Sequence, residues 1–161
     1  LFNKKKLNLK NFKYFTSIKK ALSDADFIQE CASENYALKT KLMSTIGKYA
    51  KPNAIISSSS SGLLPTKIYS KCKNPERAMI GHPFNPVYLL PAVEIVPGKK
   101  TSKKYLATAK KFYNSISMNP MSTSQRSMAS CANNSMLRSA NRLAPCLRCS
   151  VSALALSIQY L

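Results

Sequence analysis

Glycine is scarce in this chain of 161 residues, which contains four glycines in all. They stand too far apart to form a G-x-G-x-x-G turn, which holds a pyrophosphate against the N-terminus of a helix. The sequence therefore lacks the phosphate-binding turn with which a dinucleotide-binding domain opens. Histidine is scarcer still, because His82 is the single one. It is the only side chain here whose ordinary pKa lies close to neutral pH.

Acidic residues are also few: six stand against 25 lysines and arginines, which gives a formal net charge of +19. Such a charge is typical of proteins that bind nucleic acids. The lysines are nevertheless scattered over the first 111 residues, without interleaved aromatic residues. We interpret them as solvent-facing lysines and expect no specific nucleic-acid partner, although polyanions should be attracted at low salt.

The cysteine pattern predicts neither a metal site nor a disulfide framework. Of five cysteines, only Cys146 and Cys149 form a C-x-x-C pair, with no second pair and no nearby histidine. A structural zinc site needs four ligands, so we expect no bound metal. An odd cysteine count without a signal peptide favours a reducing cytoplasm, and no apolar run is long enough for a membrane partner. A start at Leu1 rather than Met indicates a fragment.

Apolar segments alternate between strand-like and helix-like patterns. This alternation predicts an α/β fold with a mostly parallel sheet. The helix expected over 35–50 should place Leu38, Leu42, Ile46 and Tyr49 on its buried face. Strands are expected over 12–16, 26–31, 55–58, 78–82 and 93–96, and helices over 17–25, 35–50, 65–70 and 101–117.

His82 has a carboxylate, Glu94, on the next expected strand. A histidine beside a carboxylate is a minimal general-base pair, because the carboxylate fixes the tautomer and stabilises the imidazolium. A structural histidine at a strand end is the alternative, since single His–Glu pairs are common.

A run of serines, 57–61, follows the apolar segment 54–56 and continues into Gly62-Leu63-Leu64-Pro65. We interpret it as a buried strand that ends in a turn of small residues. Ligands bind at such strand ends in open α/β sheets. A low-complexity linker is the alternative, but the flanking strand and the Leu-Leu-Pro segment argue against it.

Three motifs together resemble the NAD-binding domain of the 3-hydroxyacyl-CoA dehydrogenase superfamily. They are SSSSGLLP at 58–65, GHPFNPVYLLP at 81–91 and VEIV at 93–96, and the resemblance covers about residues 10 to 119. Pro83 after the histidine, with VYLLP at 87–91, resembles the L-carnitine dehydrogenase branch. The resemblance implies an incomplete Rossmann-like, mostly parallel sheet that lacks the first βαβ unit. The change in composition after Pro120 adds an irregular or disordered C-terminal tail.

The resemblance also implies roles for particular residues. His82 matches the base that takes the proton of the substrate hydroxyl, and Glu94 matches the carboxylate that orients it. Ser61 and Asn85 match the groups that hold the reacting oxygen. Two further matches, Glu34 and Lys39, belong to positions near the nicotinamide ribose of NAD. A capping acid and a solvated lysine on a helix are the alternatives for these two.

The activity implied by the resemblance is NAD-dependent oxidation of a secondary 3-hydroxyl to a ketone. L-Carnitine is the first expectation for the small-molecule substrate, and an L-3-hydroxyacyl-CoA thioester is the second. The family dimerises through a helical domain that this sequence lacks. Without the glycine turn, the isolated chain should bind NAD poorly. A non-catalytic remnant or a basic binding module remains an alternative of a different class.

Composition divides the chain into three parts: a basic, disordered segment 1–11, a partial NAD-binding domain 12–120 and an atypical tail 121–161. The tail has no lysine and no acid, but it holds four of the five arginines. A reading-frame shift after Pro120 explains such a change, and a divergent natural tail is the alternative. A helix over 150–161 is expected within it, without a well-packed partner.

Overall fold

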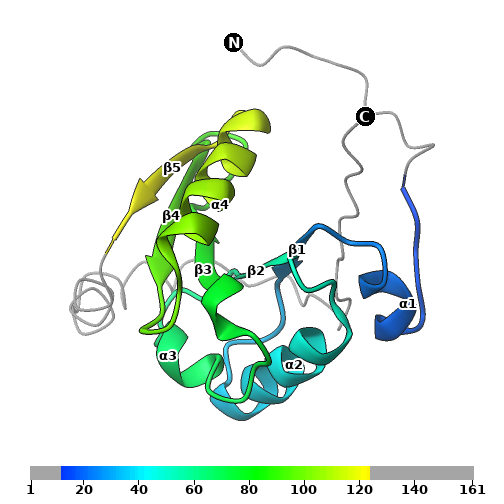
Figure 1. Ribbon diagram of the computed structural model, residues 1–161. Helices are drawn as coiled ribbons and strands as arrows, with labels where there is room; N and C mark the ends of the chain where they lie inside the picture. Colours follow the sequence, from blue (N-terminus) through cyan, green and yellow to red (C-terminus); the bar gives the residue numbers. More distant parts are fainter. Residues whose placement is uncertain (1–11, 124–161) are drawn as a thin grey trace.

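A computed structural model of the protein describes residues 12–123 (Figure 1). The described elements are α1 (Ile18–Leu22), β1 (Phe27–Glu30), α2 (Tyr36–Tyr49), β2 (Ile55–Ser58), α3 (Pro65–Ile68), the 3-10 turn η2 (Pro75–Arg77), β3 (Ala78–Pro83), β4 (Ala92–Pro97), α4 (Lys103–Ser115) and β5 (Asn119–Ser122). Strands and helices alternate along most of the chain, as expected for an α/β fold.

The strands form one sheet in the order β1-β2-β3-β4-β5. β1, β2 and β3 run parallel, β4 runs antiparallel to β3, and β5 runs parallel to β4. The predicted mostly parallel sheet is therefore confirmed. Because the first three strands are parallel, their carboxyl ends share one edge of the sheet, where the antiparallel β4 begins.

Apolar side chains alternate between the two faces of this sheet, as the period of two in a strand requires. Ile28, Ile56 and Ile80 pack against residues of α1, α2 and α3 on one face. Their chain neighbours, among them Phe27 and Ile55, pack on the other face against α4. The fold is thus a three-layer α/β/α arrangement, with α4 opposite α2 and α3 (Figure 1).

Two expectations about strands were wrong. Residues 12–16 form no strand, and their aromatic side chains are exposed, with Tyr14 stacked edge-on against Phe12. Conversely, β5 was not predicted, because the expected irregular tail began at 121 and Pro120 lies within the strand. A proline is tolerated there because β5 pairs with a single neighbour, β4, at the edge of the sheet.

The buried face of α2 also differs from the expectation. Leu38 is 41% exposed, whereas Lys39 is 1% exposed and Met43 is fully buried. The helix is therefore rotated by about one residue relative to the predicted face. The reason is a buried ion pair made by Lys39, which periodicity of apolar residues cannot reveal.

The expectations for 1–11, for the helix over 150–161 and for the C-x-x-C pair lie outside the described residues. The same holds for most of the tail 121–161, and β5 crosses position 120. Within residues 12–123, no group of three or more His, Cys, Asp and Glu side chains could hold a metal ion. None of the helices in that range is long and apolar enough to cross a membrane.

Candidate active site

The candidate residues meet at the carboxyl edge of the parallel strands. β1 ends at Glu30, β2 ends at Ser58, and His82 lies near the end of β3. Glu94 is the direct partner of His82 in the antiparallel register of β3 and β4. The sheet itself therefore places the imidazole and the carboxylate side by side, although they lie twelve residues apart in the chain.

The distance between His82 Nδ1 and Glu94 Oε2 is 3.9 Å, and the two side chains are 23% and 18% exposed. This distance suits an ion pair with a protonated imidazole and is longer than a hydrogen bond. His82 Nδ1 is buried and has no hydrogen-bond partner. Catalytic hydrogen bonds are often long without substrate and tighten in the Michaelis complex. Glu94 is the acceptor that a small movement would bring to Nδ1.

Burial lowers the pKa of His82 below its usual value, because a charged imidazole loses hydration. The negative charges of Glu94 and Glu34 oppose this effect and raise the pKa, but burial dominates. The imidazole is therefore largely neutral at pH 7. A neutral imidazole can accept a proton, as a general base must.

Glu34 binds the turn that follows β2. Its Oε1 accepts hydrogen bonds from Ser60 Oγ at 2.6 Å and from the backbone N–H groups of Ser61 and Gly62, each at 2.9 Å. We call Ser60, Ser61 and Gly62 the serine turn. The capping alternative for Glu34 is wrong, since Asn35 caps α2 by accepting from the N–H of Leu38. Ser61, whose hydroxyl is the candidate oxygen-binding group, is an exposed residue of this turn.

Lys39 lies in the first turn of α2 and points into the protein. Its ammonium donates to Glu30 Oε1 at 2.9 Å, to Glu30 Oε2 at 3.0 Å and to the carbonyl of Ala32 at 2.9 Å. Glu34 Oε2 is 3.7 Å from the same ammonium. The alternative of a solvated lysine is wrong. Glu30 was missed by the sequence analysis, although a carboxylate at the end of a buried strand is a signal for such a pair.

The loop from β3 to β4 carries Asn85, an exposed residue joined to Pro86 by a cis peptide bond. Phe84 places its ring centroid 5.7 Å from that of His82. The next residues of the loop are apolar yet exposed, from 42% at Val87 to 70% at Tyr88. An aromatic ring therefore lies beside the imidazole, and exposed apolar residues follow it in the loop.

Gly81 allows a buried network to pack against the strand that carries His82. Tyr113 donates to Gln29 Oε1 at 2.7 Å and lies 2.9 Å from Ser57 Oγ. Gln29 in turn donates to the carbonyl of Gly81 at 3.0 Å. A Cβ on Gly81 would lie 2.1 Å from Tyr113 Oη, so a side chain does not fit there. This support was not predicted, because it joins residues 84 positions apart.

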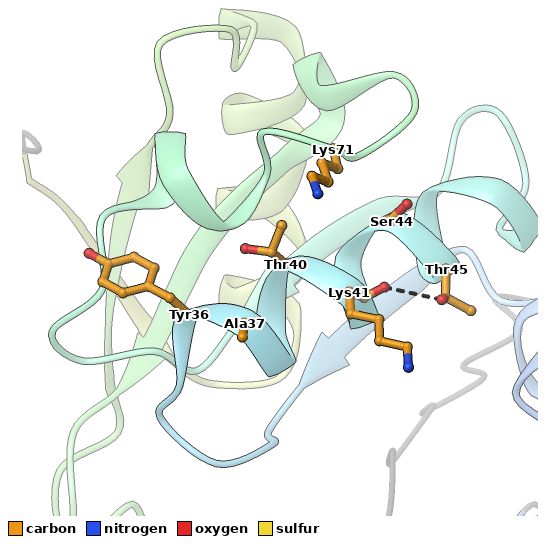
Figure 2. Close-up of a pocket in the computed structure, with 7 residues that line it drawn as sticks. All are labelled: Tyr36, Ala37, Thr40, Lys41, Ser44, Thr45 and Lys71. Carbon is orange, nitrogen blue, oxygen red and sulfur yellow. Dashed lines mark hydrogen bonds between the residues drawn. The ribbon is translucent and has the colours of Figure 1, made fainter.

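A groove lies along one side of α2 (Figure 2). It is lined by Tyr36, Ala37, Thr40, Lys41, Ser44, Thr45 and Lys71. None of the candidate site residues lines this groove. Tyr36 connects it to the site region, because its hydroxyl accepts from the N–H of Leu64, just after the serine turn.

A family model, the NAD-binding domain of 3-hydroxyacyl-CoA dehydrogenase, matches residues 3–126. The chain belongs to this family. Members of the family are NAD-dependent dehydrogenases that act on a hydroxyl group, and residues 3–126 of this chain match their NAD-binding domain.

Curated relatives and solved structures agree with this assignment. An L-carnitine dehydrogenase of a Pseudomonas species is 50% identical over 108 residues, which cover 67% of this chain and 34% of that protein. An L-carnitine dehydrogenase of Staphylococcus epidermidis is 42% identical over 111 residues, which cover 69% of this chain and 35% of that protein. The chain thus spans about a third of the length of these relatives.

Among solved structures, a 3-hydroxybutyryl-CoA dehydrogenase of Escherichia coli K12 superposes with a TM-score of 0.66 at 29% identity, covering 69% of this chain and 23% of that one. A 5-formyl-3-hydroxy-2-methylpyridine 4-carboxylic acid 5-dehydrogenase, an NAD⁺-dependent dismutase, gives a TM-score of 0.70 at 28% identity. That match covers 81% of this chain and 43% of the other.

The residues of this family member fit one end of NAD. The carboxyl edge of the sheet offers polar groups and a neutral imidazole, which suit the nicotinamide and its ribose. The sequence contains no glycine turn to hold the pyrophosphate, since its four glycines are Gly47, Gly62, Gly81 and Gly98.

Proposed function

We propose that this chain carries the catalytic groups of an NAD-dependent dehydrogenase that oxidises the 3-hydroxyl of L-carnitine to a ketone. The observation that carries the proposal is the pair of His82 and Glu94, held across β3 and β4 at the carboxyl edge of the sheet. Burial lowers the pKa of His82, so this lone histidine is available as a base at neutral pH.

In the proposed reaction the hydroxyl proton passes to the ring nitrogen of His82 that does not face Glu94. The Glu94 carboxylate then stabilises the imidazolium. Bound NAD would supply the acceptor for the hydride of the carbon that carries the hydroxyl, so that the C–H and O–H bonds are exchanged for a C=O bond. Ser61 and Asn85 hold the oxygen, and Glu34 lies toward the nicotinamide ribose. Lys39 stands behind Glu34 and keeps its donors on Glu30 and Ala32.

The ring of Phe84, beside His82, supports L-carnitine as the substrate. The trimethylammonium group of L-carnitine is a cation without hydrogen-bond donors, and aromatic faces attract such groups. An L-3-hydroxyacyl-CoA thioester is the second candidate. The fold similarity to a 3-hydroxybutyryl-CoA dehydrogenase supports this candidate.

The test is NADH formation by the full 161-residue chain at high NAD concentration, with L-carnitine or L-3-hydroxybutyryl-CoA. We expect faster turnover with L-carnitine, and loss of turnover in His82→Gln but not in Lys41→Gln, since Lys41 is exposed on α2. Calorimetry with NAD should show weak binding, because the pyrophosphate turn is missing. A folded chain that forms no NADH from either substrate would favour a non-catalytic remnant or a basic binding module.

We also propose which partners the protein has and that it works in the cytoplasm. The partner in catalysis is a small molecule, with no specific nucleic acid or membrane involved, and dimers form through a helical domain of the longer family members. Free Cys31 and Cys72 are consistent with a reducing cytoplasm.

A further inference from the structure

The ends of β1 and β2 and the start of α2 are joined by one buried carboxylate, that of Glu30. Glu30 is 3% exposed and Lys39 is 1% exposed. Besides the two contacts from Lys39, the carboxylate accepts hydrogen bonds from Ser58 Oγ and from the N–H of Ala32. Both oxygens of Glu30 and the donors of the Lys39 ammonium are therefore occupied inside the protein.

This arrangement leaves Lys39 no free donor for a ligand. The ammonium stands between the buried Glu30 and the partly exposed Glu34, whose side chain is 39% exposed. Glu34 uses its two oxygens differently: Oε2 lies 3.7 Å from Lys39, while Oε1 accepts from Ser61 and Gly62. Lys39 thus attracts one oxygen of Glu34, which leaves the other directed at the serine turn.

We propose that Glu30 is a positioning residue of this site: through Lys39 it fixes Glu34, and Glu34 holds the serine turn that presents Ser61. The proposal rests on the function proposed above only in the role of Ser61. Glu30 holds the Lys39 ammonium 3.7 Å from Glu34 Oε2. Without this ion pair no ammonium attracts Oε2, and Glu34 is free to rotate away from the turn.

Stability alone does not account for the pair. Removing both charges of a buried ion pair together is often neutral or stabilising, because desolvation costs about as much as the attraction returns. Removing one charge leaves the other buried without a partner, and the fold is strongly destabilised. A double variant that removes both charges therefore separates a positioning role from a structural one.

The experiment compares amide exchange of Ser61 and Gly62 by NMR in wild type and in Glu30→Gln/Lys39→Met. Gln keeps an acceptor oxygen for the Ala32 N–H, and its amide N–H can donate to Ser58 Oγ, so the double variant should fold. We expect both amides to exchange at least about fivefold faster, because one ordinary hydrogen bond slows exchange by about that factor. A smaller increase would overturn the proposal if the double variant has the same unfolding temperature as the wild type.

Two further variants keep the result decisive. Lys41→Met removes an exposed lysine of the same helix and should leave both amides unchanged. Glu34→Ala removes the acceptor itself and gives the exchange rate of a released serine turn, which the double variant should approach. If the double variant does not fold, Glu30→Gln/Lys39→Gln, which also removes both charges, replaces it, with the same expected increase and the same overturning outcome. No turnover is measured, so failure of the proposed enzyme activity leaves this test intact.

Discussion

Replacing Glu94 with Gln should lower the pKa of His82. The substitution keeps the size and a polar end but removes the negative charge 3.9 Å from Nδ1. Burial already lowers the pKa of His82, and Glu94 is the stronger of the two carboxylates that oppose burial. Without it, desolvation acts with less opposition, and the neutral imidazole becomes more favoured.

The size of the shift follows from the distance between the charges. Two unit charges 3.9 Å apart attract by about 1 kcal/mol in water and by about 4 kcal/mol at the effective dielectric near a protein surface. Since about 1.4 kcal/mol corresponds to one pKa unit, the expected decrease is about one to three units. Both side chains retain some exposure, which favours the lower part of this range.

Proton NMR can measure this pKa directly, because His82 is the only histidine in the chain. Its ring C–H resonance reports one titration without assignment. Glu34→Gln should lower the pKa by less, since its charge acts more weakly on His82. Glu76→Gln is the matched control, because Glu76 lies in η2 at the opposite end of β3 and should leave the titration unchanged.

An unchanged or higher pKa in Glu94→Gln would refute the reasoning, since it would mean that the carboxylate does not stabilise the imidazolium. The same titration predicts a stability effect. The folded pKa is lower than the unfolded value of 6.5, so the contribution of neutral His82 is complete above about pH 6.5. It is lost as the pH falls toward the folded pKa, because the unfolded state then binds more protons.

Three further predictions concern stability. Gly81→Ala should lower the free energy of unfolding by about 1–3 kcal/mol in urea denaturation, because its Cβ would overlap Tyr113 and Ser57. Gly62→Ala, whose Cβ would meet its nearest atom at 3.9 Å, should not lower it. Burial raises the pKa of Cys72 from 9.0 to about 11, so stability should fall by up to about 3 kcal/mol between these pH values. Cys72→Ala should remove that part of the alkaline loss, and an unchanged pH slope would contradict the assignment. Arg77→Met should cost about 2–4 kcal/mol, because the buried guanidinium donates to the carbonyls of Lys51, Ala54 and Gly47. A loss below 1 kcal/mol would show that these bonds contribute little.

The parts of the fold that could be predicted from sequence are those set by local patterns. The strand over 55–58 is an apolar run bounded by polar turns, and its bounds match β2. The helix that became α4 begins at a capping serine, Ser102, and shows alternating lysines and apolar residues. His82 and Glu94 were paired because two short strands joined by a single loop tend to lie side by side.

The parts that could not be predicted depend on contacts between distant residues. Lys39 has the sequence context of a solvated lysine. Its burial depends on Glu30 at the end of β1, because the attraction of that buried carboxylate offsets the hydration that the ammonium loses. The network of Tyr113, Gln29 and Ser57 joins α4 to two strands, so no local pattern contains it. β5 is short and contains a proline, and its pairing with β4 alone makes it a strand.

The distribution of charge bears on the choice of substrate. The chain is strongly basic as a whole, yet three of its six acids, Glu30, Glu34 and Glu94, gather at the carboxyl edge of the sheet. Lys39 neutralises one of them, and a largely neutral His82 neutralises none. The edge around His82 is therefore locally negative within a positive protein. Such an edge attracts a quaternary ammonium and repels a group of phosphates close to the imidazole. A CoA thioester would have to keep its phosphates on the outer, lysine-rich surface, whereas L-carnitine would bring its cation directly to the acidic edge.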